Sequence, residues 1–384
     1  MRIAYCIDEI EASGGTERIT VTKANALARI PTNEVFIIVA YNRNNSINTL
    51  DNVKLIDLDV RYYADSGLGK IKELLFVLNK RKEHARKMRS ALESISPDIV
   101  VSTGMSEKFF IQNLSISSNP CFVREIHFSK YYRRLTAESL YEKIIAFGGE
   151  LFDYIISIRG YDKIVVLTDE DRLTNWKSNP KVVSIPNPLS QPSTEISDLS
   201  NKTVISAGRL ERQKNYVSLI SAWRYVSSKH PDWILKIYGK GSQYDLLLSQ
   251  IKALGLKGSV FLEGFSHDIM HEISQSSIYT LTSITEGMPL VLIEAMTCGV
   301  PIVSYMCPSG PKDIISEGEN GFLVPVGDEK ALADRINQLI EDEELRRKIG
   351  CRALEMSKAY SLDMIIPRWM ALFNKLLEEK RKHL

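Results

Sequence analysis

The chain alternates between short apolar runs and longer helical patterns, and this feature constrains its fold more than any other. In the first half, strands are expected at residues 2–7, 35–40, 53–58, 99–102, 121–125, 163–167 and 182–185. Helices are expected between them, at residues 16–28, 68–94 and 137–158, with a short one before the last strand. Strands that alternate with helices predict a parallel sheet covered by helices on both faces.

A second series of the same kind follows residues 187–200, which are rich in proline, serine and acidic side chains and are interpreted as a linker. Its strands are expected at residues 202–207, 234–238, 260–263, 279–283, 302–305 and 321–324. Its helices are expected at residues 215–228, 243–254, 268–274, 289–297, 311–316 and 328–340. We therefore predict α/β domains over residues 1–188 and 189–360. The helix at 361–384, apolar at three-to-four spacing, is expected to pack back across the first domain.

Two doubly wound sheets in tandem place ligand sites at the carboxyl ends of both, so a shared cleft is expected between the domains. A composition of 44 % apolar and 25 % charged residues is typical of a soluble globular enzyme, and a net charge of +2 does not indicate a nucleic-acid partner. The five scattered cysteines, without CxxC spacing, indicate reduced thiols in a cytoplasmic protein and no zinc site. We expect neither a secretory signal nor a membrane span, because no apolar run approaches roughly 18 residues.

The run T-E-G-M-P-L-V-L-I-E-A-M places Glu286 in a loop and Glu294 on the helix that follows. Pro289 suits the first helical position, where its missing N–H costs nothing. The two carboxylates can therefore hold opposite ends of one polar ligand, and the helix start offers free N–H groups to an anion. An isolated E-x7-E pair is usually a solvated loop residue and a helix-surface residue, so this interpretation depends on the neighbouring loops.

Three other loops at predicted strand ends share this chemical character. The loop that begins with Gly208 carries Arg209 and Lys214, and a guanidinium fork with an ammonium is a combination suited to a diphosphate. Cations at a helix start are electrostatically unfavourable, which also favours an anionic ligand there. Gly239 and Gly241 follow the next strand and permit close backbone approach, and residues 307–311 read C-P-S-G-P before a helix. Together these loops match a nucleoside diphosphate joined to a sugar.

As a set, these motifs resemble the retaining GT-B glycosyltransferases of family 4. The resemblance rests on G-R-L-x3-K-N at 208–215, the Glu286-x7-Glu294 pair, G-V-P at 299–301 and G-x2-G-F-L-V at 318–324, and it covers essentially the whole second domain. In the first domain G-G-T-E-R at 14–18, E-I-H at 125–127 and V-V-L-T at 165–168 are weaker signals. The variant C-P-S-G-P resembles members that build bacterial surface polysaccharides and lipid-linked glycans.

The resemblance implies a role for each matched residue. Arg209 and Lys214 would neutralise the donor diphosphate, Glu294 would bind the ribose hydroxyls, and Glu286 would contact the transferred sugar. His127 would face the donor sugar near the reacting carbon, although an ordinary hydrogen-bonded loop histidine fits the same residue. The remaining donor-site positions that it implies are Gly15, Gly208, Gly239, Gly241, Gly287, Met288, Pro289 and Leu290. The chemistry would be a front-face reaction that requires placement and charge stabilisation of the leaving diphosphate.

No metal or other cofactor is required by this fold, so metal-independent transfer is expected. The D-x-D spacing occurs at Asp57 and Asp59, at a strand end, and at Asp169 and Asp171, at a helix start where acids suit the dipole. Neither is expected to hold a metal. Thr168 can cap that helix, or contact the acceptor.

Two basic segments of the first domain, residues 70–89 and 130–134, suit anionic lipid headgroups or a polyprenyl diphosphate, although an ordinary amphipathic helix with a solvated basic face fits the first equally well. We thus expect a cytoplasmic enzyme, peripheral on the inner face of the plasma membrane. It would move a hexose-type sugar, from a UDP-sugar for preference, to a glycan or polyprenyl-diphosphate-linked acceptor in bacterial polysaccharide biosynthesis. The alternatives are an NAD(P)-dependent oxidoreductase, although no G-x-G-x-x-G follows a predicted strand, and a catalytically silent sugar-nucleotide-binding subunit.

Overall fold

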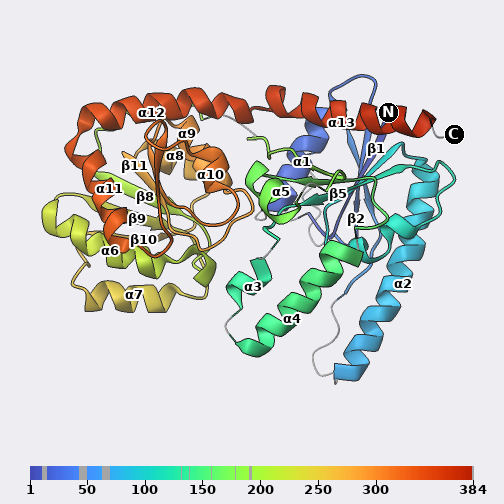
Figure 1. Ribbon diagram of the computed structural model, residues 1–384, viewed down its shortest axis with the longest axis horizontal. Helices are drawn as coiled ribbons and strands as arrows, with labels where there is room; N and C mark the ends of the chain where they lie inside the picture. The colour runs from blue at the N-terminus through green and yellow to red at the C-terminus, as the bar shows by residue number, and fades with distance from the viewer. Residues whose placement is uncertain are drawn as a thin grey trace.

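A computed structural model describes residues 1–10, 15–42, 50–62, 70–130, 132–137, 139–156, 158–177, 179–189 and 193–382. Two α/β domains lie next to each other, each built on one parallel sheet, and two long C-terminal helices run across both (Figure 1). The predicted fold class is confirmed. All five cysteines are free thiols, as expected.

The first sheet has the strand order β3-β2-β1-β4-β5-β6-β7, and every neighbouring pair is parallel. Its strands are β1 (Arg2–Ile7), β2 (Glu34–Val39), β3 (Val53–Asp57), β4 (Ile99–Ser102), β5 (Cys121–Ile126), β6 (Lys163–Val166) and β7 (Val182–Ser184). Its helices are α1 (Gly15–Ala28), α2 (Lys70–Ile95), α3 (Tyr132–Thr136), α4 (Leu140–Leu151) and α5 (Asp169–Asn175), with the short turns η1 (Glu107–Phe109), η2 (Ile111–Asn113) and η3 (Phe152–Ile156). The central strands are buried on both faces, which is why they read as unbroken apolar runs.

The second sheet has the order β10-β9-β8-β11-β12-β13 and is also parallel throughout. Its strands are β8 (Thr203–Ala207), β9 (Ile234–Tyr238), β10 (Val260–Gly264), β11 (Ile278–Leu281), β12 (Ile302–Tyr305) and β13 (Gly321–Val324). Its helices are α6 (Tyr216–Lys229), α7 (Tyr244–Ala253), α8 (Ile269–Ser274), α9 (Leu290–Thr297), α10 (Pro311–Ile314), α11 (Glu329–Glu341) and α12 (Glu343–Ser357), with the turns η4 (Arg212–Lys214) and η5 (Lys358–Tyr360). The strand order reverses between β1 and β4 in the first sheet and between β8 and β11 in the second, and ligands bind at such switch points.

The last helix, α13 (Leu362–Lys382), returns to the first domain. Its Trp369 and Phe373 are fully buried in one apolar cluster with Ile3 and Val35 of the first sheet. The predicted crossing of the C-terminal helix is therefore confirmed. Residues 185–202 connect the two sheets, and the predicted boundary at residue 188 lies within this connection.

The structure corrects two local expectations and adds one helix. The single helix expected at 137–158 is divided: α4 ends at Leu151, and a π-helical turn follows to Ile156. Pro289 is the N-cap residue of α9 rather than its first helical residue, because its ψ of 97° is extended. Helix α12, for which no prediction was made, follows α11 directly and is capped by Asp342, whose carboxylate accepts the Leu345 N–H at 2.8 Å.

Candidate active site

The two switch points face each other, so groups from opposite domains come into contact there. Helix α1, which follows β1, carries Arg18, whose Nη2 lies 2.6 Å from Oε1 of Glu294 on α9. Gly287, in the loop after β11, packs so closely on the His127 backbone that a Cβ there would lie 2.0 Å from the His127 carbonyl oxygen. Beside them, Met288 Sδ accepts the Asn187 N–H at 3.2 Å. The predicted Glu286 loop therefore lies at the contact between the domains.

Glu286 and Lys214 form an ion pair within the second domain. Lys214 Nζ donates to Glu286 Oε1 at 2.7 Å, and both side chains are largely buried. The Glu286 N–H donates to the Pro308 carbonyl at 3.3 Å, which joins the loops after β11 and β12. One of the two cations expected to bind a diphosphate is thus already paired with the carboxylate expected to bind the sugar.

Arg209, unlike Lys214, is unpaired within the described residues. Its side chain is exposed at the end of β8, and within the described residues its guanidinium makes no hydrogen bond or ion pair. A guanidinium that is left free at a switch point can bind an incoming anion without breaking an existing contact.

Glu294 carries a nearly buried carboxylate, with 3 % of its side chain exposed. Arg18, which pairs with it across the domains, was not predicted as a site residue, although it ends the quoted motif at 14–18. Gly14 of that motif lies outside the described residues. Gly15 is the exposed first residue of α1, and no atom of the described residues lies within 4 Å of a Cβ built on it.

His127 follows β5 and lies next to a buried ion pair. Its Nε2 lies 3.2 Å from Glu125 Oε1, and Glu125 is paired in turn with the ammonium of Lys23 from α1. Burial alone would raise the pKa of Glu125, but Lys23 and His127 together lower it to about 2, so the carboxylate stays ionised. The Lys23 ammonium also lies 4.7 Å from the Trp369 ring. The sequence analysis did not single out Lys23. The signal for it is a lysine among the small and apolar residues of α1.

The glycines of the second domain have a packing role. A Cβ on Gly239 would lie 1.9 Å from the Gly208 carbonyl oxygen, and one on Gly241 would lie 2.4 Å from that of Leu210. The loops after β8 and β9 therefore need these glycines in order to touch each other. The expectation that the same glycines approach a donor stays a prediction.

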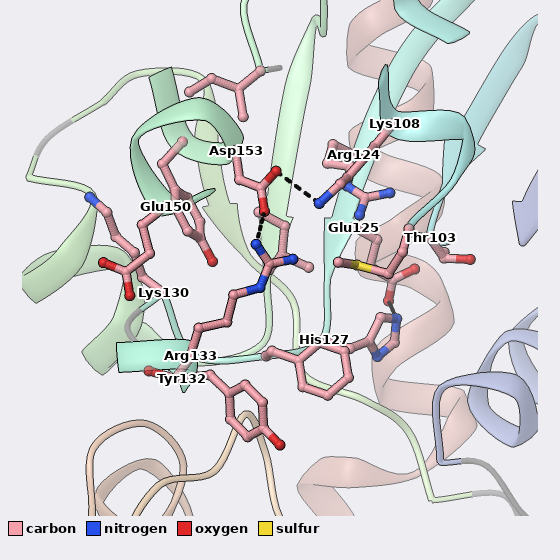
Figure 2. A pocket seen from close by; sticks show the side chains of 16 residues that line it. Thr103, Lys108, Arg124, Glu125, His127, Lys130, Tyr132, Arg133, Glu150 and Asp153 are labelled. Atoms are coloured by element: carbon pink, nitrogen blue, oxygen red, sulfur yellow. Dashed lines mark hydrogen bonds and ion pairs between the residues drawn. The ribbon is translucent and has the colours of Figure 1, made fainter. Parts of the chain in front are cut away.

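A cavity of about 280 Å³ opens in the first domain beside His127 (Figure 2). It lies between the end of β5, α3 and the last turns of α4 and η3. The polar groups that line it include Thr103, Lys108, Arg124, Glu125, His127, Lys130, Tyr132, Arg133, Glu150 and Asp153. Of this set, the sequence analysis singled out only the E-I-H motif at 125–127 and the segment 130–134.

The charged groups of the cavity are organised around Asp153 (Figure 2). Its Oδ1 lies 2.8 Å from Lys108 Nζ, and its Oδ2 lies 3.3 Å from Arg133 Nη1. Burial lowers the pKa of Lys108, and the hydrogen bond and charge of Asp153 oppose that shift. Arg124 is held by the Ser102 hydroxyl at 2.8 Å and the Gly104 carbonyl at 2.7 Å. The cavity thus joins cations to the exposed aromatic ring of Phe128, a combination that fits a polar, anionic molecule with an apolar portion.

A second cavity, of about 360 Å³, is shared by the domains. Arg134, Leu135, Glu170, Thr174 and Asn175 line it from the first domain, and Pro308 and Ser309 line it from the second. Within the described residues, no three His, Cys, Asp or Glu side chains come together as a metal site. Metal-independent transfer stays a prediction.

Comparison with known proteins identifies the second domain. Residues 191–356 match the family described as Glycosyl transferases group 1. An uncharacterized glycosyltransferase of Haemophilus influenzae is 29 % identical over 376 residues, which cover 97 % of this chain and 99 % of the relative. The chain is a glycosyltransferase, and its second domain matches the group 1 family. The oxidoreductase alternative is thereby set aside.

Other relatives of this glycosyltransferase have more specific names. The amylovoran biosynthesis glycosyltransferase AmsD of Erwinia amylovora is 27 % identical, over 97 % of the chain and 99 % of that protein. A Campylobacter jejuni protein, N-acetylgalactosamine-N,N'-diacetylbacillosaminyl-diphospho-undecaprenol 4-alpha-N-acetylgalactosaminyltransferase, is 30 % identical over 50 % of the chain and 53 % of its own length.

The solved structure of a variant of S. aureus TarM superposes with a TM-score of 0.76 at 16 % identity, covering 97 % of the chain and 99 % of TarM. That structure contains UDP. The likeness shows that the glycosyltransferase has the GT-B fold.

Proposed function

We propose that this glycosyltransferase moves a hexose-type sugar from a UDP-sugar to a polyprenyl-diphosphate-linked or other glycan acceptor, with retention of configuration, in bacterial polysaccharide biosynthesis. One observation carries the proposal: Gly287 of the predicted donor loop packs on His127, which also lines the first-domain cavity. A donor held by the loop and an acceptor held in the cavity would therefore meet at His127. The UDP in the TarM structure and the lipid-linked substrate in the name of the Campylobacter relative support the two substrate classes.

The second domain would hold the donor. Arg209, which is free of ion pairs within the described residues, would contact the diphosphate first, and Lys214 would share its charge between the diphosphate and Glu286. Glu294 would accept hydrogen bonds from the ribose, so Arg18 would move aside or share the carboxylate. These charge-assisted hydrogen bonds would stabilise the departing UDP without a metal ion.

The first domain would supply the acceptor and the group nearest the reacting carbon. The ionised Glu125 would hold the His127 imidazole at the wall of the cavity. The leaving phosphate would take the acceptor proton on the same face of the sugar, and the protein would contribute placement of the two substrates.

The proposed division of the donor site between Glu294 and Glu286 can be tested by calorimetry with UDP and by donor turnover. Glu294→Ala should weaken UDP binding by about 10- to 150-fold, because a charge-assisted hydrogen bond contributes roughly 1.5 to 3 kcal/mol. Glu286→Ala should reduce turnover and leave UDP affinity within about threefold of the wild type, because UDP carries no sugar. Glu344→Ala, at an exposed carboxylate of α12, is the control and should change neither quantity.

Two outcomes would contradict this assignment. If both variants lose UDP affinity equally, the ribose and sugar sites have been assigned wrongly. If the wild type neither hydrolyses nor transfers any UDP-sugar, GDP-sugar or ADP-sugar, the chain is the catalytically silent alternative. A thermal-shift panel of the free nucleotides chooses the donor base beforehand, since a ligand that binds only the folded state raises the melting temperature.

A further inference from the structure

The outward face of α4 is apolar and has no protein partner in the described structure. Six large apolar side chains of this helix are 49 % to 76 % exposed: Leu140, Tyr141, Ile144, Ile145, Phe147 and Leu151. Phe152 and Ile155 extend the same exposed surface into η3. We call this surface the α4 face. Elsewhere exposed apolar side chains are sparser, as is usual at a protein surface, so the α4 face needs an explanation.

Helical geometry shows that the α4 face is one continuous stripe. At 100° per residue, its members within α4 fall in an arc of roughly 160°. Ala146 and Glu150 lie on the opposite side and are buried. The helix is about 18 Å long, from its 12 residues at about 1.5 Å each. Its buried side faces the first domain, and Glu150 lines the cavity. The stripe is therefore not a displaced part of the core.

Cations lie on α4 itself and on the helices α3 and α2 of the same domain. Lys143 is exposed on the helix itself, and the side chains of Arg133 and Arg134, on the preceding helix α3, are 44 % and 41 % exposed. On α2, exposed Lys82 and Arg86 accompany Leu75 and Leu78, which are 55 % and 42 % exposed. An apolar stripe bordered by Lys and Arg is the pattern of a helix that lies in a lipid–water interface.

Phe109 of η1 contacts both α2 and Phe152, the first residue of η3, which directly follows α4. The Arg81 guanidinium of α2 lies 3.8 Å from the Phe109 ring centroid, and the centroid of the Phe152 ring of η3 lies 5.5 Å from the same centroid. Both helices project beyond the sheet at the same edge of the first domain (Figure 1). A planar surface at this edge could therefore contact both.

We propose that the α4 face inserts into the boundary between headgroups and acyl chains of an anionic bilayer, while the cations of α2, α3 and α4 bind its headgroups. Within the described residues no helix is long and apolar enough to cross a bilayer, so this attachment would be to one leaflet. The cavity would then open near the membrane surface, where a lipid-linked acceptor could reach it; that consequence rests on the proposed function, whereas the insertion does not.

The bordering charges favour a lipid surface over a second copy of the chain. A symmetric dimer through the α4 face would bury two copies of the same cation-bearing patch in one interface, because both copies contribute the same patch. An anionic bilayer offers apolar chains to the stripe and opposite charge to its borders at once.

Flotation of the full chain with vesicles tests the insertion. The vesicles are phosphatidylcholine alone, or phosphatidylcholine with one third phosphatidylglycerol, at low salt and at about 1 M NaCl, where screening reduces the reach of charge to about 3 Å. The test variant is Ile144→Ser with Ile145→Ser. The control is Leu246→Ser with Leu248→Ser on α7 of the second domain, where both leucines are similarly exposed at 54 % and 48 %. Neither variant changes the net charge, so a difference in vesicle binding between them reflects the loss of apolar contact.

We expect the wild type and the control to bind anionic vesicles and to retain part of that binding at about 1 M NaCl. The α4 variant should bind at least about tenfold more weakly and lose the salt-resistant part, because lost apolar burial reduces partitioning. Equal binding of the α4 variant and the control would overturn the proposal, as would a wild type that binds no vesicles. A wild type that sediments as a dimer which Ile144→Ser with Ile145→Ser dissociates, without vesicle binding, would assign the face to self-association instead. No donor or acceptor is present, so the result is independent of the proposed transfer reaction.

Discussion

Lys23 and Glu125 form a fully buried ion pair beside His127, and both side chains have 0 % exposure. Taking two charges out of water is costly, and the loss of one partner leaves the other uncompensated. Glu125→Gln should therefore lower the free energy of unfolding by about 3 to 5 kcal/mol, measured by urea denaturation. The exposed pair of Lys54 and Glu34 gives the matched control: Glu34→Gln there should cost less than about 1 kcal/mol.

A double variant that removes both buried charges distinguishes the stabilising role of Glu125 from its role in positioning His127. Lys23→Met with Glu125→Gln removes both charges and leaves no uncompensated buried ammonium, so the free energy of unfolding should recover much of what Glu125→Gln alone loses. Turnover should nevertheless stay low, because His127 has lost the carboxylate that lies 3.2 Å from its Nε2. Wild-type turnover in this double variant would show that Glu125 does not position His127.

The buried carboxyl group of Glu107 is expected to make the free energy of unfolding depend on pH. Burial, and then the nearby charge of Asp8, raise its pKa from 4.5 to about 7, and Arg124 opposes the shift. Between these values the folded state keeps a proton that the unfolded state releases, so this group makes stability fall as pH rises. His84 acts oppositely: burial lowers its pKa from 6.5 to about 4, so its contribution to stability rises with pH in that window.

The two groups thus oppose each other between about pH 4.5 and 6.5. Glu107→Gln removes the falling contribution, so urea unfolding of this variant should show stability that rises with pH by up to about 3 kcal/mol across the window. His84→Gln, as the converse control, should show stability that falls. The same slope in both variants and the wild type would mean that these groups titrate normally.

At the level of elements, the regular alternation of strands and helices was predictable because parallel strands buried on both faces need unbroken apolar runs. Helix α12 gave a weak signal because it is buried largely through small or polar residues. Gly350 packs against the chain at Gly299, where a Cβ would lie 2.3 Å from the carbonyl oxygen, and Arg346 and Ser357 are buried beside apolar Ile349 and Ala353. Periodicity reports large apolar side chains, so such a helix is easily missed.

Helix α4 shows a different limit of sequence patterns. The helix expected at 137–158 is rich in apolar residues, and periodicity alone does not say which of its faces is buried. The structure buries only Ala146 and Glu150 of its 12 residues. No single-chain pattern distinguishes a face that covers a core from a face that needs an external partner, because both are selected for apolarity.

For the molecule as a whole, the candidate site was predictable within each domain and not between domains. Loops at strand ends follow from the order of elements, which is why Glu286, Lys214 and His127 could be singled out within their domains, and their roles stay predictions. The pair of Arg18 and Glu294 joins residues 276 positions apart, and its geometry depends on how the two sheets are oriented. That orientation depends partly on polar contacts between elements of the two domains, which carry no periodic signal.

Asp313 of α10 is one such contact. Its Oδ1 accepts the Asp169 N–H of α5 at 2.7 Å, and its Oδ2 accepts the Glu170 N–H at 3.2 Å, so a second-domain residue caps a first-domain helix. Glu170 returns the interaction by accepting the Ser309 N–H at 3.1 Å. Free N–H groups at a helix start are stabilised by a carboxylate, and here that stabilisation holds two domains together.

Asp313→Ala should therefore cost about 1 to 2 kcal/mol in urea unfolding and should also increase the radius of gyration measured by small-angle X-ray scattering. Asp342→Ala removes a cap of the same kind within the second domain, where the carboxylate accepts the Leu345 N–H at 2.8 Å. It should cost a similar free energy without any change in the radius of gyration, because it joins no domains. If Asp313→Ala is as compact as Asp342→Ala, the cap does not hold the domains together, and their arrangement depends on α13 and on the contacts around Gly287 instead.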